Sequence, residues 1–281
     1  MMKKRSEIKG TVNMNGNYYD ESEYTFVICA YGESPYLEEC IQSLFVQSIS
    51  TEIILVTSTP NEHINALVEK YQIKYYINEG PKGIAEDWNF GYQKASGKVV
   101  TIAHQDDIYE PFFAQRNLEK INCAHRPLIS FADYGEIRDG ERVISNKLLN
   151  IKRIMLLPLR FHILQGSRFI RRRILSFGSP ICCPSVTYVK ENLPEVIFEP
   201  GYRSNVDWQA WEKISRRKGS FVYCTDILMF HRIHQDSATT AIIADNDRSK
   251  EDYAMFCKFW PKKIAGIIEC FYRNGEKSNK I

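Results

Sequence analysis

The chain has no long apolar run. No window of the 281-residue sequence approaches the run of roughly 20 apolar residues that is needed to span a bilayer. Residues 1–23 also lack the apolar core of a signal peptide. We therefore expect a cytoplasmic protein rather than an integral membrane or exported one. With 44% apolar and 25% charged residues, the composition is that of a globular chain with a substantial core.

Cysteines are present, but not in the paired spacings of a zinc site. They are scattered, several lie in apolar runs, and two are neighbours in sequence, which disfavours a bond between them. We interpret them as reduced, mostly buried thiols, in keeping with the cytoplasm. The eight are Cys29, Cys40, Cys123, Cys182, Cys183, Cys224, Cys257 and Cys270.

Acidic residues are absent between Glu141 and Glu191, whereas basic residues are frequent there. Such a region attracts phosphates, anionic lipid or acidic glycans, while a net charge of +3 gives no argument for nucleic acid. Residues 147–173 have an amphipathic helical pattern, so the basic groups either line a solvated face or dock the protein on a membrane. The basic residues of the region between Glu141 and Glu191 include Lys147, Lys152, Arg153, Arg160, Arg168, Arg171, Arg172, Arg173 and Lys190.

Strand and helix patterns alternate from residue 24 onward, which predicts an α/β fold with a parallel sheet and right-handed crossovers. Apolar runs predict the first four strands at residues 25–29, 52–56, 74–77 and 99–103, with amphipathic helices between them. The rhythm then loosens, and we predict a strand at 128–132, a strand pair at 221–230 and a C-terminal helix at 248–260.

The fourth predicted strand runs directly into two carboxylates, Asp106 and Asp107, in the segment VVTIAHQDDIYEP. Ligands of open α/β sheets bind at the carboxyl ends of the strands, and carboxylates there can hold Mg²⁺ or Mn²⁺ against substrate phosphates. The alternative is that the pair caps a helix beginning near Pro111.

Two turns at the same predicted edge contain glycine. In the turn after the first strand, Tyr31 can stack on a ligand ring, or the segment is a plain turn. The second turn, NEGPKGIAEDWN, offers backbone N–H groups to an anion around Gly83 but lacks a P-loop ending. Asn89 follows within its helix and either reaches a ligand or faces solvent.

Two polar groups come from the second half of the chain. Asp207 precedes a helical stripe of Trp208, Trp211 and Ile214, so it is either an N-cap or a general base with a raised pKa. The segment HRIHQDSAT places His231, Arg232, His234, Ser237 and Thr239 after an apolar strand, where they suit a diphosphate or a metal.

In order and spacing, these segments resemble a family 2 glycosyltransferase of the GT-A fold, across residues 25–240. The resemblance is carried by TFVICAYGESPYLEECIQSL, NEGPKGIAEDWNFGYQKASG, HQDDIYEP, the VDW segment and HRIHQDSATT. It implies a mostly parallel sheet flanked by helices, followed by an irregular half that binds the acceptor. It also implies an enzyme of the type that builds bacterial surface polysaccharides.

The resemblance assigns roles by position. Asp207 falls where inverting members keep the catalytic base, and the implied metal ligands are Asp106, Asp107 and His234. The implied nucleotide-sugar contacts are Ala30, Tyr31, Glu33, Ser58, Gly83, Asn89, Gln105, Asp106 and Arg232. The implied parts are a tail at 1–23, a nucleotide-sugar half at 24–135, an acceptor half at 136–240 and a helical extension at 241–281.

Two positions depart from the family pattern. The second strand continues as Val56-Thr57-Ser58-Thr59 where relatives carry acids that hold the nucleoside, so Ser58 contributes only a neutral partner. The first acid of the Asp-x-Asp element is His104, followed by Gln105. The Gln-x-x-Arg-Trp element of processive synthases is absent from the sequence, which favours addition of a single sugar.

The expected function is inverting transfer of one sugar, with Mg²⁺ or Mn²⁺, from a nucleotide sugar to a hydroxyl of a glycan or polyprenyl-diphosphate-linked acceptor. A UDP-sugar is the favoured donor, and residues 147–173 are the expected contact with the inner face of the cell membrane. Two alternatives stay open. One is a catalytically inactive sugar-nucleotide-binding subunit. The other is a sugar-phosphate nucleotidyltransferase. Such enzymes carry a Gly-rich basic signature after the first strand, and the segment GESPYLEE at this place does not match it.

Overall fold

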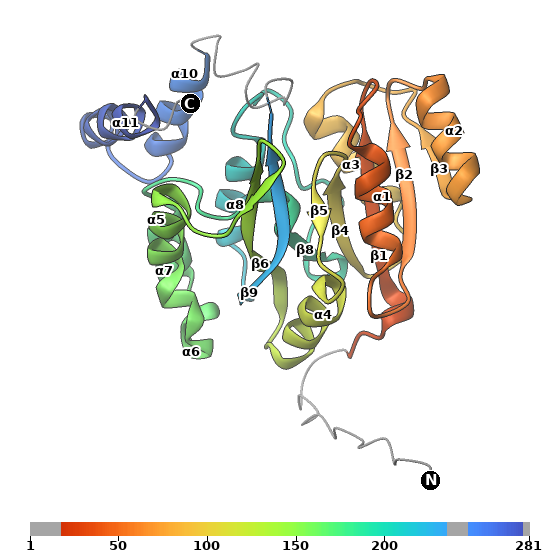
Figure 1. Ribbon diagram of the computed structural model, residues 1–281. Helices are drawn as coiled ribbons and strands as arrows, with labels where there is room; N and C mark the ends of the chain where they lie inside the picture. The colour runs from red at the N-terminus through yellow and green to blue at the C-terminus, as the bar shows by residue number, and fades with distance from the viewer. Residues whose placement is uncertain (1–17, 235–246, 278–281) are drawn as a thin grey trace.

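The computed structural model describes residues 18–234 and 247–277, and its main element is one twisted sheet (Figure 1). Within these residues the sheet has nine strands in the order β3-β2-β1-β4-β8-β6-β9-β5, with β7 paired to β6. The strands are β1 (Tyr24–Ala30), β2 (Glu52–Thr57), β3 (Lys74–Ile77), β4 (Val99–His104), β5 (Ile108–Tyr109), β6 (Pro127–Arg138), β7 (Glu141–Val143), β8 (Val186–Val189) and β9 (Ser220–Ile233).

The first four strands are parallel, as their near-continuous apolar runs predict. The second half of the sheet is mixed, because β8 runs antiparallel between β4 and β6 while β9 pairs parallel with β6. β5 pairs with β9 and so attaches the segment after the acid pair to the far side of the sheet. The α/β prediction is confirmed.

Helices cover both faces of the sheet. Alternate residues of β1 point to opposite sides, so Phe26 and Ile28 pack with α1, α2 and α4, whereas Val27 packs with α3 and the core around α8. The helices are α1 (Leu37–Phe45), α2 (Glu62–Tyr71), α3 (Ile84–Lys94), α4 (Phe113–Cys123), α5 (Lys147–Leu156), α6 (His162–Gln165), α7 (Arg168–Leu175), α8 (Val206–Ser215), α10 (Asp247–Cys257) and α11 (Lys262–Lys277).

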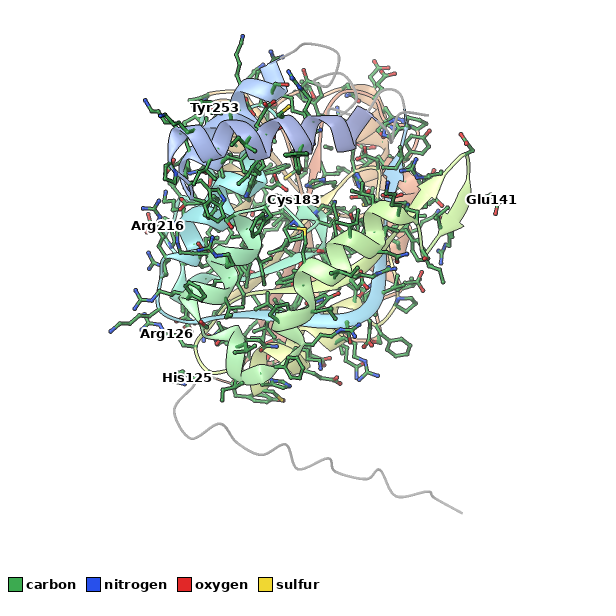
Figure 2. All side chains as sticks on the ribbon, turned by 90° about the vertical axis from the view of Figure 1, so that its left-hand side faces the viewer. His125, Arg126, Glu141, Cys183, Arg216 and Tyr253 are labelled. Atoms are coloured by element: carbon green, nitrogen blue, oxygen red, sulfur yellow. The ribbon has the colours of Figure 1, made fainter. Side chains whose placement is uncertain are left out.

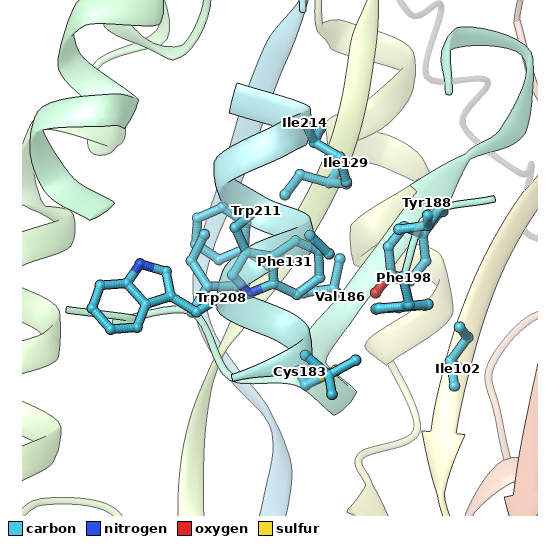
Figure 3. Packing of buried hydrophobic residues seen from close by; sticks show 14 of the residues in the cluster. Ile102, Ile129, Phe131, Cys183, Val186, Tyr188, Phe198, Trp208, Trp211 and Ile214 are labelled. Carbon is cyan, nitrogen blue, oxygen red and sulfur yellow. The ribbon is translucent and has the colours of Figure 1, made fainter. Parts of the chain in front are cut away.

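The predicted apolar stripe of α8 is buried against the second half of the sheet. Trp208, Trp211 and Ile214 are almost completely enclosed (Figure 3). The indole of Trp211 stacks on Tyr188 of β8 with ring centroids 5.9 Å apart. Trp208 donates its Nε1 hydrogen to the carbonyl of Leu175, 3.0 Å away. These contacts fix the helix that carries Asp207.

Several element bounds differ from the prediction. β6 extends to Arg138 rather than ending near 132, and β9 is one strand rather than a pair. The C-terminal helix ends at Cys257, and α11 follows it. At the other end, the expected tail at 1–23 includes Tyr19, which is buried and hydrogen-bonds Asn122 through its main-chain N–H.

The cysteine prediction is confirmed in its main points. All eight cysteines lie within the described residues and are unpaired thiols. Six are buried or half-buried, and Cys123 and Cys270 are exposed. Of the helices in the described ranges, none combines the length and the apolar character that crossing a bilayer requires.

Gly91 allows α3 to lie close to the sheet. A Cβ at this position would be 2.5 Å from Cγ1 of Val27 and 3.0 Å from Cγ2 of Val56, so Gly91→Ala should lower the free energy of unfolding by roughly 1–3 kcal/mol. Gly266→Ala in α11 is the matched control, because its nearest new contact is 3.9 Å away and alanine favours helix. Urea denaturation measures the free energy of unfolding of both variants. Equal values for the two would contradict the close packing of α3.

Candidate functional site

The candidate site lies at the carboxyl ends of β1, β2 and β4. Cys29 pairs with His104, and Ala30 pairs with Thr57, so the residues following the three strands meet at one edge of the sheet. Two of the predicted site groups, the turn at Tyr31 and the acid pair, are therefore neighbours. The hydrogen bonds described below connect them.

The turn after β1 is locked to the segment after β4. The main-chain N–H of Tyr31 donates to Oε1 of Gln105 at 2.9 Å, and Nε2 of Gln105 donates back to the Tyr31 carbonyl at 3.1 Å. The Tyr31 side chain is 67% exposed, so its ring is free to stack on a ligand. Ala30 is buried beneath it, and Glu33 is exposed on the same turn.

Ser58 lies at this edge together with a carboxylate that the sequence analysis did not single out. Its hydroxyl donates to Oδ2 of Asp87 at 2.6 Å, and Nδ2 of Asn78 donates to the other oxygen at 2.7 Å. Asp87, on α3, is buried. An acid is thus present beside β2, supplied by a helix rather than by the strand. The signal in the sequence was an aspartate on the buried side of an amphipathic helix.

Gly83 is the N-cap residue of α3 at the same edge, with φ of 154°. A Cβ there would lie 2.3 Å from Oε2 of Glu86, so a side chain would displace that carboxylate. The side chain of Asn89 binds main-chain groups of the protein. Its amide donates to the Phe198 carbonyl at 2.7 Å and accepts from the Ile197 N–H at 3.0 Å. Asn89 therefore joins α3 to the segment at residues 197–198.

The two acids after β4 have different surroundings. Asp106 is partly exposed, and its Oδ2 accepts a hydrogen bond from Nε2 of His234 at 2.9 Å. Asp107 is fully buried, and its Oδ1 contacts both Nδ1 of His231 and the main-chain N–H of Arg232, each at 2.9 Å. Neither acid caps a helix, because the N-cap position of α4 is Phe112. The alternative of a capping pair is wrong.

Electrostatics favours an ion pair between Asp107 and His231. Burial disfavours both charges, but the imidazole and the Arg232 N–H keep the pKa of Asp107 below its usual value. The Asp107 carboxylate correspondingly raises the pKa of His231. His104, which stacks on Trp88 at 4.9 Å, has its pKa lowered by burial and is neutral.

Arg232 holds the acid pair in place. Its Nε donates to the main-chain carbonyl of Asp106 at 3.0 Å, and its Nη2 donates to Glu39. The guanidinium also lies over the Tyr36 ring, 4.3 Å from its centroid. Two donors of this nearly buried side chain are thus used by protein groups, so Arg232 positions the acids. Ser237 and Thr239 lie outside the described residues.

Asp207 lies in the first turn of α8, where Asn205 occupies the N-cap position. Its Oδ1 accepts the main-chain N–H of Trp208 at 2.7 Å, and its side chain is half-buried. Burial raises the pKa of Asp207 to about 6, although Trp208 and the charge of Lys152 oppose the rise. This is the environment expected of a general base, and the N-cap alternative is wrong.

Asp107 and Asp207 both lie near enough to the turn that precedes β8 for their charges to act on it. The charges of both carboxylates act on the thiols of Cys182 and Cys183, whose pKa values are raised well above the usual value, mainly by burial. Cys183 lies beside the end of α8 from which Asp207 projects (Figure 3). The acid pair and the candidate base therefore act electrostatically on the same turn.

The donor groups fit a hard divalent cation. Within residues 18–234 and 247–277, no three Asp, Glu, His or Cys side chains form a ready-made cage. Asp106 and His234 are adjacent, however, and Oδ2 of Asp107 is buried without a hydrogen-bond partner. Mg²⁺ typically uses one or two carboxylates and completes its shell with water and substrate phosphates, and imidazole also suits Mn²⁺.

Sequence comparison supports the predicted family. The family model described as Glycosyl transferase family 2 matches residues 25–192. An uncharacterized glycosyltransferase of Nostoc sp. is 25% identical over 232 residues, which cover 74% of this chain. The chain spans 64% of the length of that relative.

Solved structures show the same fold. The chain resembles residues 1–349 of TarS from S. aureus in complex with UDP-GlcNAc, with a TM-score of 0.59 and 15% identity over 92% of this chain and 73% of that one. It resembles the mannosyltransferase PcManGT of Pyrobaculum calidifontis, in complex with GDP-Man and Mn²⁺, with a TM-score of 0.59 and 12% identity over 89% and 67%.

A third match is glucosyl-3-phosphoglycerate synthase of Mycobacterium tuberculosis, in complex with Mn²⁺, UDP and glucosyl-3-phosphoglycerate. Its TM-score is 0.57 and its identity 14%, over 85% of this chain and 80% of that one. At these identities the structural matches bear on the fold, and they confirm the predicted GT-A architecture.

Proposed function

The chain belongs to glycosyl transferase family 2, and on that premise we propose that it is an inverting transferase that moves one sugar from a UDP-sugar to an acceptor hydroxyl. The observation that carries the proposal is that the acid pair and Asp207, which have unlike surroundings, lie near the same turn, where the charges of Asp107 and Asp207 act on the same two thiols. Asp106 is partly exposed and lies beside His234, and burial raises the pKa of Asp207 to about 6. Asp106 is suited to hold the cation of a leaving diphosphate, and Asp207 is suited to accept a proton.

The donor nucleotide is proposed to bind against the β1 and β2 turns. Tyr31 offers an exposed ring for stacking, and the main-chain groups of Gly83 lie at the start of α3. Ser58 and Asp87 together supply hydrogen-bonding groups for the ribose or base. Arg232 and Gln105 keep the connecting segments in position. Two of the similar structures contain UDP-GlcNAc and GDP-Man, which supports a nucleotide-sugar ligand.

The reaction proposed is a direct displacement. Asp207 accepts the proton of the acceptor hydroxyl while that oxygen bonds to the anomeric carbon, and the carbon–oxygen bond to the diphosphate breaks with inversion. Asp106 and His234, with Asp107 behind them, would hold Mg²⁺ or Mn²⁺, which when bound neutralises charge on the diphosphate. His231 keeps Asp107 ionised next to that position. General-base assistance is worth roughly 10²–10⁴-fold in rate.

The acceptor half is proposed to be residues 136–240, and the acceptor a glycan or a polyprenyl-diphosphate-linked sugar used in cell-surface polysaccharide. Supporting observations are the position of Asp207 in this half and the amphipathic segment 147–173. That segment exposes Ile151, Ile154 and Phe161 beside its basic residues. We propose that it rests on the inner face of the cell membrane, where a lipid-linked acceptor is presented.

A thermal-shift panel tests the donor proposal. UDP, GDP, CMP, dTDP and ADP are each added with Mn²⁺ and with EDTA, and UDP with Mn²⁺ should give the largest rise in Tm. A ligand at 100 times its Kd stabilises the fold by about 2.7 kcal/mol, or roughly 5–10 °C for a chain of this size. A response to another nucleotide would correct the donor, and no response to any would overturn the transferase proposal. Binding without sugar transfer would indicate the inactive binding subunit instead.

A further inference from the structure

A groove separate from the candidate site lies between α7 and the segment that joins α10 to α11. It has a volume of about 190 Å³ and opens to the surface. Three of its six lining residues are arginines and two are phenylalanines. The lining residues are Arg168, Phe169, Arg172, Arg173, Ser176 and Phe259.

The three arginines of this groove have different partners, and Arg168 donates to the Arg216 carbonyl at 3.5 Å. Arg172 pairs with Glu212 at 2.6 Å. Arg173 lies over the rings of Phe169 and Trp260, 5.6 and 4.6 Å from their centroids. Among the described residues, neither Arg168 nor Arg173 has a carboxylate within ion-pair distance. Two cations thus keep their full charge available to an anionic ligand.

Exposed apolar side chains flank the groove on both sides. Ile163 on α6 is 88% exposed, and Phe169 on α7 is 68% exposed. On α11, the outward positions Ile264, Ile267 and Phe271 form a second stripe, with Phe271 75% exposed. The opposite side of α11 is the one that packs on the body, through Ala265 and Ile268 among others. A helix with apolar residues on its solvent side has an unfilled partner surface.

The two stripes belong to one face of the molecule. Trp260, just before α11, donates its Nε1 hydrogen to the carbonyl of Ser176 at 2.8 Å and packs on Phe177. These contacts attach the start of α11 to the end of α7. Figure 1 places α5, α6, α7 and α11 on the same side, and Figure 2 shows that side facing the viewer, with α11 across its upper part.

We propose that this groove binds the phosphate headgroup of an anionic phospholipid at a membrane surface, with the α6–α7 and α11 stripes entering the boundary of the acyl chains. The proposal rests on the membrane contact proposed above for residues 147–173 and extends it to α11. Charge decides between a membrane and a second copy of this chain. The exposed cations of the face would repel those of a second copy and attract anionic lipid. They are Arg160, Arg168, Arg173, Lys262 and Lys263.

The test is co-sedimentation of the full chain with vesicles of phosphatidylcholine alone or mixed with phosphatidylglycerol. The full chain should bind the mixed vesicles and not the neutral ones. Arg168→Gln with Arg173→Gln should weaken that binding roughly 30-fold, the factor expected for two cations at an anionic surface. Lys70→Gln with Lys74→Gln, which removes two exposed lysines at the opposite edge of the sheet, is the control of equal charge change.

Further arms separate the outcomes. Ile267→Gln with Phe271→Gln should lower binding to mixed vesicles at high salt, where charge is screened. Equal loss in the arginine and lysine variants would overturn the groove proposal and leave only a general charge effect. Stabilisation by glycerol phosphate in solution, without vesicle binding, would overturn the lipid and indicate a free phosphate ligand. The nucleotide response is read in every variant, so a failure of the donor proposal is distinct from a failure of this one.

Discussion

Asp207→Asn is expected to lower turnover by roughly 10²–10⁴-fold while leaving the nucleotide response unchanged. The amide keeps the shape of the side chain and can still accept the Trp208 N–H, but it cannot take a proton. The readout is the rate of sugar transfer measured next to the thermal shift with nucleotide and Mn²⁺. Wild-type turnover in this variant would show that the base lies elsewhere.

The pH dependence gives an independent check on Asp207. Because its pKa is raised to about 6 from 3.8, turnover should fall as pH drops through 6 and the base becomes protonated. The folded protein binds this proton more tightly than the unfolded chain does, so the group lowers stability as pH rises through about 4 to 6. At pH 7 the ionised Asp207 carboxylate therefore lowers the free energy of unfolding.

Asp207→Asn removes that charge and should raise the free energy of unfolding at pH 7 by roughly 1 kcal/mol. The full shift would correspond to about 3 kcal/mol, and solvent contact of the half-buried side chain reduces it. A helix-capping role predicts the opposite sign, since loss of a cap destabilises. Urea denaturation at pH 7 and pH 4 separates the two roles, with the difference vanishing at the lower pH.

Asp106→Asn is expected to abolish the Mn²⁺-dependent part of the nucleotide response. The variant loses the charge of the more exposed carboxylate while the hydrogen bond toward His234 can persist. Stabilisation of roughly 5–10 °C with nucleotide and Mn²⁺ should fall to the level seen with EDTA. Asp226→Asn, at an exposed carboxylate on β9, is the control. A full Mn²⁺ response in the Asp106 variant would remove this residue from the proposed metal site.

The parallel half of the sheet could be predicted because its signal is local. β1, β2 and β4 are apolar on both faces, and a continuous run such as Val99 to Ala103 has few other interpretations. The amphipathic pattern of α8 was equally clear, since Trp208, Trp211 and Ile214 follow helical spacing. The acid pair after β4 was visible for the same reason, because the strand before it defined the edge of the sheet.

The second half could not be read this way because its polar residues are buried beside distant partners. Asp133 and Glu136 interrupt the apolar pattern of β6, yet both are buried. Asp133 is paired with Arg153 of α5, and Glu136 with Arg138. A pattern of residue classes contains no information on such partners, so β6 was predicted to end too early.

The same limit applied within the site. Asn89 and Asp87 are two residues apart on α3, and the sequence pattern did not show that Asp87 is the one beside the end of β2. Asp87 faces Ser58 and Asn78, whereas Asn89 binds the main chain at residues 197–198. Their roles depend on which side of the helix meets the end of β2, which is set by the crossing of α3 over the sheet and not by residue type.

The antiparallel strand β8 determines which parts of the fold can change while the sheet is kept. It joins β4 to β6 within one sheet, and β5 pairs with β9 beyond it, so main-chain hydrogen bonds connect the strands on both sides of β8. Among the described residues, the sheet is therefore continuous from β3 to β5. Asp106 follows β4, and α8, which carries Asp207, packs on β8 through Trp211 and Tyr188, so both acids are attached to this sheet. On the function proposed above, we expect a change of acceptor to come from changes in α5, α6 and α7 rather than from changes in the sheet.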